Sequence, residues 1–304
     1  MSSAKNKSGL LLSHLGAVLV MSAWGASFVS TKVLLDNGLH PAEIYVYRFL
    51  LAYLLILIVC HKRLWSRTWR DELLFATCGL CGGSIYFIAE NTALQYTFAT
   101  NVSLITSLSP IITTIIIGAI YKSERPKRGF IYGSSIAFVG VACVVLNSST
   151  SLEVRPLGDF LSLLAAIAWS VYSIVLKRLN RTYSVMFISR KTFFYGIITA
   201  IPFVLIEPEI ASPAILLRPT VMANLLFLGL FASMLGYVLW AEAIKRLGAL
   251  TASNYLYFQP IVTMIASALL IDERVTVVGV VGCALIIIGV WLSDFLSRRQ
   301  IKRL

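Results

Sequence analysis

Ionisable side chains interrupt several long apolar stretches of this chain. The first half contains Lys32, Arg48 and Glu90 within such stretches, and the second half contains Lys177, Arg190, Lys191 and Glu242. A charged side chain near the centre of a bilayer costs about 2.5–3.5 kcal/mol, so it requires a partner, a water-filled cavity or an interfacial position. We therefore interpret these residues as candidates for coupling, gating or ligand binding. Structural ion pairs, and cations whose heads reach the membrane interface, are the alternative for each of them.

Polar and aromatic residues at helical spacing form a second set of candidates. Ser103, Ser107 and Pro110 are spaced i, i+4, i+7, and Ser253, Tyr257 and Pro260 repeat that spacing later in the chain. Several such side chains that converge in a membrane interior indicate a cavity for a small polar or amphipathic molecule. The full binding set is Trp24, Phe28, Tyr86, Glu90, Asn101, Ser103, Ser107, Trp169, Tyr172, Tyr237, Asn254 and Tyr257. For any single serine, helix packing is the alternative.

The two prolines have a separate role in this interpretation. Pro110 and Pro260 each remove a backbone donor and free a carbonyl in the middle of an apolar run, which favours a hinge or a gate. With them we group Lys32, Arg48, Glu90, Lys177, Lys191 and Glu242 as the coupling or gating set.

Neither enzymatic nor cofactor chemistry is indicated. The histidines, His14, His40 and His61, lie near the ends of apolar runs, and we find no nucleophile–base pair, metal-ligand cluster or nucleotide-binding motif. Cys78 and Cys81 have C-x-x-C spacing, but Gly79 and Gly83 around them favour close helix packing instead. We expect no enzyme activity, no cofactor and no metal.

The elements that position these residues must lie in lipid. Apolar residues make up 58% of the 304 residues and charged residues 13%, and the mean hydropathy is +0.83, beyond what a soluble core requires. Runs of about 17–25 residues can span a bilayer as helices. They are placed at about 11–35, 42–60, 72–96, 99–121, 128–147, 157–179, 186–207, 221–247, 250–271 and 275–297.

The second half of the chain repeats the first. Pro110, Glu124, Gly133 and Gly140 recur with nearly the same spacing as Pro260, Glu273, Gly282 and Gly289. Trp24 in the first half corresponds to Trp169 in the second, and Tyr86 corresponds to Tyr237. Each half has five spans, an odd number, so the second half enters the membrane from the opposite face. We expect an all-α integral membrane protein with ten transmembrane helices, arranged as two five-helix inverted repeats around a central cavity. The repeats cover 11–147 and 157–297, with a periplasmic linker at 148–156.

The basic residues orient this arrangement. One side of the membrane has many cations in its connections and tails, whereas the other has only Arg155, Arg218 and Arg274. By the positive-inside rule the cation-rich side, with both termini, is cytoplasmic. This topology accounts for the net charge of +12 without nucleic acid as a partner. We expect a monomeric, multi-pass protein of the plasma (inner) membrane, in contact with lipid.

Several motifs resemble a known family. The first-half motifs are Ala23-Trp24-Gly25-x-x-Phe28, Ala93-Leu94-x-Tyr96-Thr97, Ser103-Leu104-Ile105-x-x-Leu108-x-Pro110 and Glu124. The second half repeats the pattern with Ala168-Trp169, Ala252-Ser253, Pro260 and Glu273. Together they look like the EamA-domain branch of the drug/metabolite transporter superfamily. The resemblance implies a ten-helix carrier of small metabolites, often an amino-acid exporter, with a central cavity lined by helices 1, 3, 4, 6, 8 and 9. Glu90 and Glu242 depart from the generic family pattern.

The sequence thus favours a secondary transporter that works by alternating access and exports an amino acid or a related amphipathic metabolite. A channel-like permease, a multidrug efflux carrier and, more remotely, a membrane-embedded enzyme are the alternatives. Coupling to protons depends on Glu90. Burial favours its neutral form, whereas Lys32 or Arg48 nearby favours the carboxylate. In the first case it carries a proton, and in the second it is a fixed partner or binds a substrate ammonium group.

Overall fold

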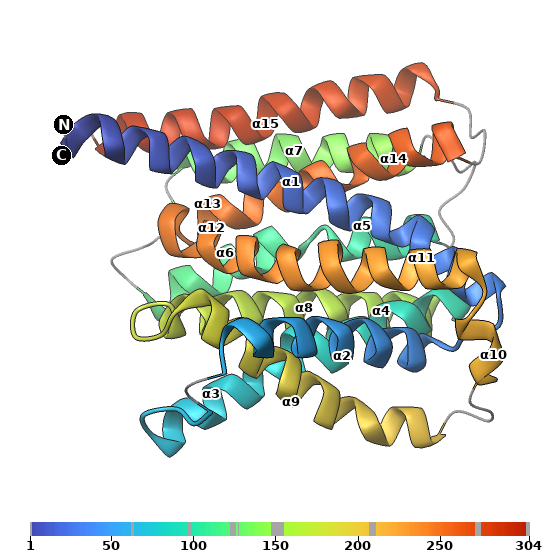
Figure 1. The fold of residues 1–304 in the computed structure, drawn as a ribbon. Coiled ribbons are helices and arrows are strands. Elements are labelled where there is room, and N and C mark those ends of the chain that lie inside the picture. Colours follow the sequence, from blue (N-terminus) through green and yellow to red (C-terminus); the bar gives the residue numbers. More distant parts are fainter. Residues whose placement is uncertain are drawn as a thin grey trace.

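The chain folds into a bundle of helices (Figure 1). The computed structural model describes residues 2–61, 64–96, 99–121, 126, 128–146, 155–206, 211–270 and 275–301. The linker expected at 148–156 lies outside them except for its last two residues, as do the repeat acids Glu124 and Glu273. Every regular element in the described residues is helical.

The described residues of the first half form seven α-helices. They are α1 (Ser2–Asp36), α2 (Pro41–Val59), α3 (Trp69–Gly79), α4 (Ile85–Tyr96), α5 (Ala99–Thr106), α6 (Ser109–Ile120) and α7 (Arg128–Leu146). A π-helical segment, Leu80–Ser84, joins α3 to α4 within one continuous span.

The second half follows the same plan. Its helices are α8 (Pro156–Leu179), α9 (Val185–Ile206), α10 (Pro213–Leu216), α11 (Pro219–Phe227), α12 (Gly236–Leu247), α13 (Ala249–Asn254), α14 (Gln259–Leu270) and α15 (Val277–Ile301). A π-helical segment, Leu228–Leu235, joins α11 to α12, and a 3₁₀ turn, Tyr255–Phe258, joins α13 to α14.

The bundle is a multi-pass membrane protein. Among the described residues, six helices are long and apolar enough to span a bilayer: 11–36, 41–59, 69–93, 156–179, 185–206 and 219–247. Shorter apolar helices cover 104–120, 128–144 and 277–293. Large apolar side chains such as Ile58, Ile115 and Leu205 are exposed on the outer surface, which is the pattern expected of a surface in contact with lipid rather than water.

Both prolines expected in mid-span sit where a helix restarts. Pro110 and Pro260 are each the second residue of the resumed helix, α6 and α14 respectively. Proline is tolerated in the first turn because its missing N–H would have no partner there. The two expected spans are therefore broken into shorter helices at these points.

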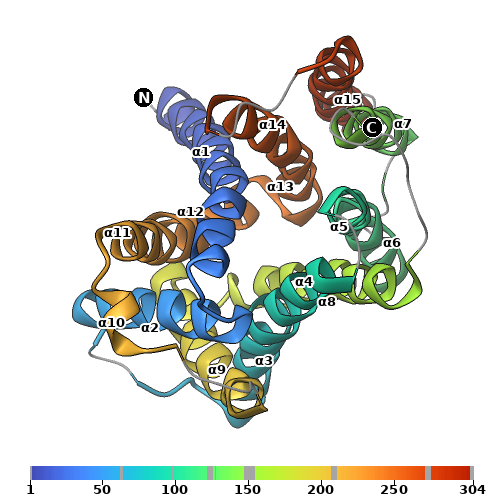
Figure 2. The same ribbon diagram turned by 90° about the vertical axis from the view of Figure 1, so that its right-hand side faces the viewer.

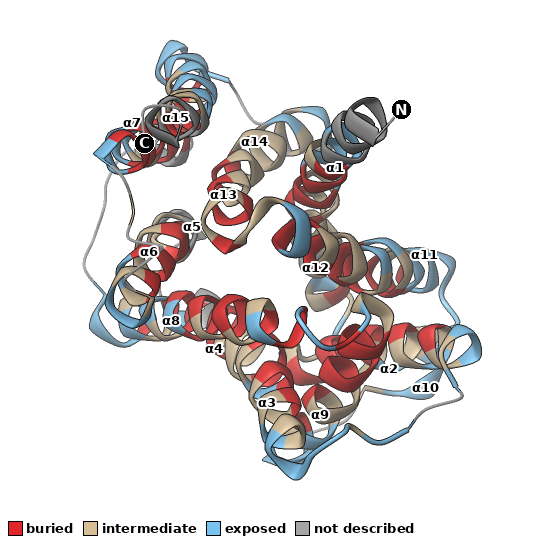
Figure 3. Ribbon diagram, turned by 90° about the vertical axis from the view of Figure 1, so that its left-hand side faces the viewer, coloured by how far each residue is buried: buried red, intermediate tan, exposed pale blue. Residues whose placement is uncertain are grey.

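The repeat glycines join the two halves. In Figures 2 and 3, α7 and α15 form a pair set apart from the rest of the bundle. A Cβ added to Gly140 would lie 2.7 Å from the carbonyl oxygen of Gly282, and a Cβ added to Gly282 would lie 2.7 Å from the carbonyl oxygen of Gly140. At the other end of the contact, a Cβ on Gly289 would lie 2.6 Å from the carbonyl oxygen of Gly133. Because higher numbers on one helix face lower numbers on the other, α7 and α15 run antiparallel.

Close packing also explains the glycines of α3 and its π-helical continuation. A Cβ on Gly79 would lie 2.5 Å from the Cβ of Tyr195 and 2.6 Å from the backbone nitrogen of Gly196. A Cβ on Gly83 would lie 2.4 Å from the hydroxyl of Tyr45. The expectation that small residues around Cys78 serve helix packing is confirmed, since α3 and the π segment approach α9 backbone to backbone.

The helix pairings within the bundle recur with the halves exchanged. Helix α1 packs against α12 and α14, and α8 packs against α4 and α6. Likewise α2 packs against the second π segment, and α9 packs against the first. The ends of α1 and α15 that carry the two termini lie at the same end of the bundle (Figure 1).

Candidate substrate site

Aromatic side chains from α1, α8, α4 and α12 meet in the middle of the bundle. The ring centroids of Trp24 and Trp169 are 5.1 Å apart in an edge-to-face arrangement at 87°. Trp169 also contacts Tyr86 at 5.0 Å, and Trp24 contacts Tyr237 at 6.1 Å. We call Trp24, Tyr86, Trp169 and Tyr237 the aromatic cluster. Each half thus contributes one tryptophan and one tyrosine to the cluster. Within each half, the tryptophan and the tyrosine are more than 60 residues apart in sequence.

Glu90 lies beside this cluster. It is one helical turn beyond Tyr86, whose hydroxyl donates to the Glu90 Oε1 at 2.8 Å. Glu90 is only 5% exposed. Lys32, which we expected as a possible partner, is exposed, and no ion pair joins it to Glu90.

Arg48 supplies a buried cation from α2. Its Nε donates to the Ser233 hydroxyl at 2.8 Å, and its guanidinium carbon lies 4.8 Å from the ring centroid of Phe87. Arg48 interacts electrostatically with Glu90, but no ion pair joins these two side chains. Two opposite charges are therefore buried in one region without neutralising each other by direct contact.

Both π-helical segments present a carbonyl to the aromatic cluster. The Trp24 Nε1 donates to the Ala232 carbonyl at 2.8 Å, and the Tyr237 hydroxyl donates to the Gly82 carbonyl. In a π-helical turn the regular i→i−4 ladder is interrupted, so carbonyls there accept bonds from other helices. Each bond joins an aromatic donor of one half to the π segment of the other.

Several expected binding residues lie elsewhere. The side-chain amide of Asn254 accepts from Ser134 at 3.0 Å and donates to Ser293 at 2.7 Å, so it ties α13 to α7 and α15. Tyr257 is fully buried in the apolar contact with α7 and α15. In this conformation both side chains contact α7 and α15, and their role in substrate binding stays a prediction.

The remaining members of the predicted binding set differ in how far they are buried and in whether the structure describes them. Tyr172 contacts Trp169 at 5.0 Å and is fully buried against Gly82, where an added Cβ would lie 2.4 Å from the tyrosine ring. Phe28 is half-buried and Ser107 is buried. The side chains of Asn101 and Ser103 lie outside the described residues.

The second-half candidates Glu242, Lys191 and Lys177 each have a different contact. Glu242 pairs with Arg246, one turn further along α12, on a partly exposed surface. Lys191 pairs instead with Glu72 of α3, with Nζ and Oε1 2.5 Å apart and side-chain exposures of 5% and 19%. Lys177 lies 4.6 Å from the ring centroid of Tyr121.

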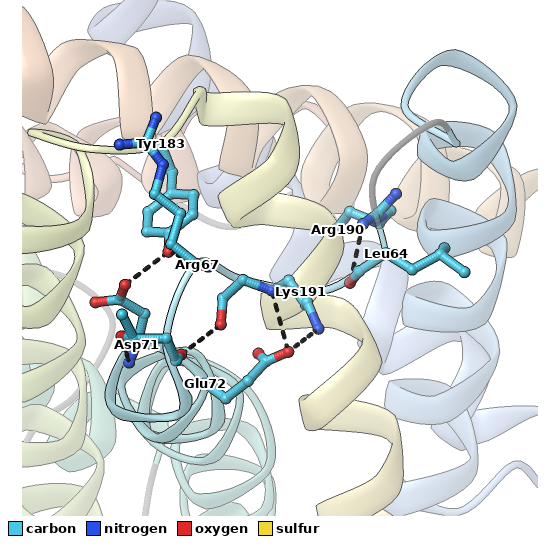
Figure 4. Close-up of polar contacts among 9 residues, drawn as sticks. Leu64, Arg67, Asp71, Glu72, Tyr183, Arg190 and Lys191 are labelled. Atoms are coloured by element: carbon cyan, nitrogen blue, oxygen red, sulfur yellow. Dashed lines mark hydrogen bonds and ion pairs between the residues drawn. The ribbon is translucent and has the colours of Figure 1, made fainter.

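A polar network fixes the segment between α2 and α3 to α9 (Figure 4). The Tyr183 hydroxyl accepts from the backbone N–H of Arg67 at 2.8 Å and donates to Asp71 Oδ2 at 2.7 Å. Arg190, on α9, donates to the carbonyls of Cys60 and Leu64. Arg190 is thus bound to the backbone at this end of the bundle rather than to the aromatic cluster.

Sequence reasoning missed three residues that matter here. Glu72 was overlooked because an acid in the first turn of a helix is usually an exposed capping residue. Glu43 is buried, and its carboxylate accepts from the backbone N–H groups of His40 at 2.9 Å and Ala211 at 2.7 Å. Ser233 gave no signal, since a serine in an apolar run ordinarily indicates helix packing.

The fold and this arrangement define an all-helical, multi-pass membrane protein with buried charges beside an aromatic cluster. Comparison with known proteins gives the family. The model of the EamA-like transporter family matches residues 11–146 and again residues 156–293. The chain therefore belongs to the EamA-like transporter family, which confirms the resemblance.

Individual relatives are distant but align over nearly their full length. An uncharacterized transporter of Archaeoglobus fulgidus is 29% identical over 284 residues, covering 92% of this chain and 96% of that protein. A probable amino-acid metabolite efflux pump of Escherichia coli is 25% identical over 286 residues, covering 92% and 93%. A probable terminal-alkyne amino-acid exporter of Streptantibioticus cattleyicolor is 25% identical over 287 residues, covering 94% and 93%.

A solved structure has the same fold. This structure, described as "Crystal structure of protein", matches with a TM-score of 0.76 and 18% identity, covering 95% of this chain and 98% of that chain. At this identity the likeness concerns the fold alone.

Proposed function

We propose that this protein is a secondary transporter that exports amino acids, or closely related amphipathic metabolites, by alternating access. Membership of the EamA-like transporter family supports the class of protein. Two of the relatives that align over nearly their whole length are named as an amino-acid exporter and an amino-acid metabolite efflux pump. The protein resides in the inner membrane with both termini in the cytoplasm, which the distribution of Lys and Arg supports.

One observation supports an amino acid as the substrate. Glu90 and Arg48 are both at least 95% buried, yet they do not pair with each other. An isolated buried charge is costly unless it meets an opposite charge. An amino acid supplies both: its ammonium group binds Glu90 and its carboxylate binds Arg48. The indole faces of Trp24 and Trp169 add cation–π attraction for the ammonium group and apolar surface for the side chain.

The transport cycle rests on the duplicated architecture. We infer ten spans in two inverted repeats, a topology that the antiparallel α7–α15 pair and the exchanged helix pairings support. In such transporters one repeat rocks against the other around a fixed central site.

One asymmetry in the packing bears on the direction that the site faces. Helix α13 packs against α6, and α12 packs against α8. Among the described residues, the equivalent pairs with the halves exchanged, α5 with α14 and α4 with α1, make no contact of similar extent. Because the first two contacts involve helix ends on the proposed cytoplasmic side, this conformation is closed inward and faces outward.

Counterflow in proteoliposomes tests the proposal. Vesicles loaded with an unlabelled amino acid are diluted into the same labelled amino acid, and each member of a panel of apolar, aromatic and charged amino acids is measured. A carrier shows transient accumulation that saturates with concentration. Labelled solute that only equilibrates, without overshoot, would instead establish a channel, and no movement of any amino acid would overturn the substrate class.

Glu90→Gln separates the two roles open to that residue. If Glu90 binds the substrate ammonium group, the variant loses counterflow and gradient-driven transport together. If Glu90 carries a proton, the variant loses gradient-driven accumulation but keeps counterflow, because exchange requires no net proton movement. Glu242→Gln is the matched control, since Glu242 pairs with Arg246 on a partly exposed surface. Unchanged transport in Glu90→Gln would remove Glu90 from the mechanism.

A further inference from the structure

Two hydrogen bonds cross between the halves of this protein in a reciprocal way. Trp24, in the first half, donates to Ala232 in the second π segment, at 2.8 Å. Tyr237, in the second half, donates to Gly82 in the first π segment. We call these two bonds the present set.

The sequence repeat defines a second set that this conformation does not contain. Trp169 corresponds to Trp24, and Tyr86 corresponds to Tyr237. With the register of the two tyrosines, Ala232 corresponds to Cys81 and Gly82 corresponds to Ser233. The complementary bonds are therefore Trp169 to the Cys81 carbonyl and Tyr86 to the Ser233 carbonyl.

Neither donor of the complementary set is bonded to a π segment in this conformation. The indole Nε1 of Trp169 is buried and has no hydrogen-bond partner, whereas its counterpart in Trp24 is bound. Buried N–H groups without a partner are rare because leaving them unpaired is costly. The hydroxyl of Tyr86 is directed to Glu90 at 2.8 Å instead of to a π-segment carbonyl. The side chain of Ser233 accepts from Arg48 at 2.8 Å.

We propose that the two sets of bonds alternate, so that the present set locks the outward-facing conformation and the complementary set locks the inward-facing one. This inference rests on the proposed alternating access. In the inward-facing conformation, Trp169 and Tyr86 bind the first and second π segments respectively, and Trp24 and Tyr237 release theirs. An inverted repeat converts one state into the other by exchanging the conformations of its halves, which is the exchange that these bonds undergo.

The exchange also connects the binding site to the direction that it faces. Tyr86 has a single hydroxyl proton, so it donates either to Glu90 or to the Ser233 carbonyl. When Tyr86 turns to Ser233, Glu90 loses its hydrogen bond, and its hold on a substrate ammonium group or on a proton changes. The Tyr86 hydroxyl therefore transmits the state of Glu90 to the second π segment.

Mirrored tryptophan substitutions test this proposal without any transport measurement. Trp24→Phe removes a bond of the present set only, and Trp169→Phe removes a bond of the complementary set only. Cysteine reporters at Phe28 and Ser173, which occupy equivalent positions in the two halves, are introduced singly into a cysteine-free background. Their labelling by a membrane-impermeant maleimide is followed from the outside for Phe28→Cys and in inverted vesicles for Ser173→Cys.

The two variants must shift the labelling in opposite directions. Trp24→Phe increases labelling at the inner reporter and decreases it at the outer one, by about fivefold or more for the loss of one buried hydrogen bond. Trp169→Phe has the reverse effect, and the double variant returns toward the wild-type ratio. Trp240→Phe is the matched control, because the Trp240 Nε1 is also buried without a partner but the first half has alanine, Ala89, at the equivalent position.

Three results would overturn the proposal. They are a shift in the same direction for Trp24→Phe and Trp169→Phe, no shift in either, and a shift in Trp240→Phe as large as theirs. A variant that aggregates is replaced by Tyr237→Phe for the present set, which keeps the ring and removes only the hydroxyl. Because labelling is measured without substrate, opposite shifts together with absent amino-acid counterflow would uphold the exchange and reject the proposed substrate class.

Discussion

The buried pair of Lys191 and Glu72 gives a quantitative prediction about stability. The two charged atoms are 2.5 Å apart, and the side chains expose 5% and 19% of their surface. Removing one partner of a buried ion pair costs about 3–5 kcal/mol, because the other charge is left uncompensated. Water reaches the more exposed Glu72, so we expect the lower end of that range, about 3 kcal/mol, for Lys191→Met.

Glu72→Gln leaves the less exposed member of the pair behind. Three aromatic rings surround the Lys191 ammonium group, including those of Trp65 and Tyr195 at 5.0 and 5.5 Å from their centroids, and they compensate part of the lost charge. We therefore expect a loss of about 3 kcal/mol here as well. The double variant Lys191→Met/Glu72→Gln leaves no buried charge, so its loss should be smaller than the sum by about 2 kcal/mol or more.

Reversible unfolding in mixed micelles, followed by tryptophan fluorescence, measures the four free energies of unfolding. The pair of Glu242 and Arg246 is the matched control, since these side chains expose 29% and 51% of their surface and exposed pairs couple by at most about 1 kcal/mol. Additive effects at Lys191 and Glu72, or a coupling no larger than that of the control pair, would refute the reasoning.

Three further predictions concern packing and topology. Gly79→Ala should lower the free energy of unfolding by about 1–3 kcal/mol, because its Cβ would lie 2.6 Å from a backbone nitrogen. Gly16→Ala is the control and should leave the free energy of unfolding unchanged, since the nearest neighbour of its Cβ would be 3.9 Å away. Equal melting temperatures for the two variants would contradict this prediction. Asn254→Ala should lower the melting temperature through the loss of two buried hydrogen bonds without changing the substrate concentration that gives half-maximal counterflow, whereas a large change in that concentration would return Asn254 to the binding site. Ser149→Cys, in a functional cysteine-free protein, should be labelled from outside intact cells, and labelling only after permeabilisation would reverse the proposed topology.

Some features of the site could be predicted from sequence because they depend on type and spacing alone. The repeat of Trp24 as Trp169 and of Tyr86 as Tyr237 is visible in the chain, and a duplicated fold brings equivalent residues to equivalent places. Glu90 stood out because an acid in an apolar run is costly wherever the helix packs. The packing role of Gly79 followed in the same way, since a run of small residues allows close helix approach.

The partners of the charged residues could not be predicted. Glu72 and Lys191 are 119 residues apart, and nothing in either apolar run indicates which acid a lysine will meet. Glu242 has a cation one turn away in Arg246, and the structure pairs these two residues. Asn254 was included in the binding set as one of several converging polar and aromatic residues, and nothing in the sequence indicated that its amide would bond to Ser134 and Ser293 on two other helices.

The sequence by itself determined the membrane environment, the family and the duplication, because hydropathy and repeat spacing do not depend on how the helices pack. Only the tertiary structure decided which carbonyl each aromatic donor meets. The π-helical turns at Leu80–Ser84 and Leu228–Leu235 have no distinct sequence signal, and they direct the Gly82 and Ala232 carbonyls toward the opposite half. The asymmetry between Trp24, which is bound, and Trp169, which is not, is a property of one packed conformation. The residue spacing that the two halves share cannot predict it, because that spacing is the same for both tryptophans.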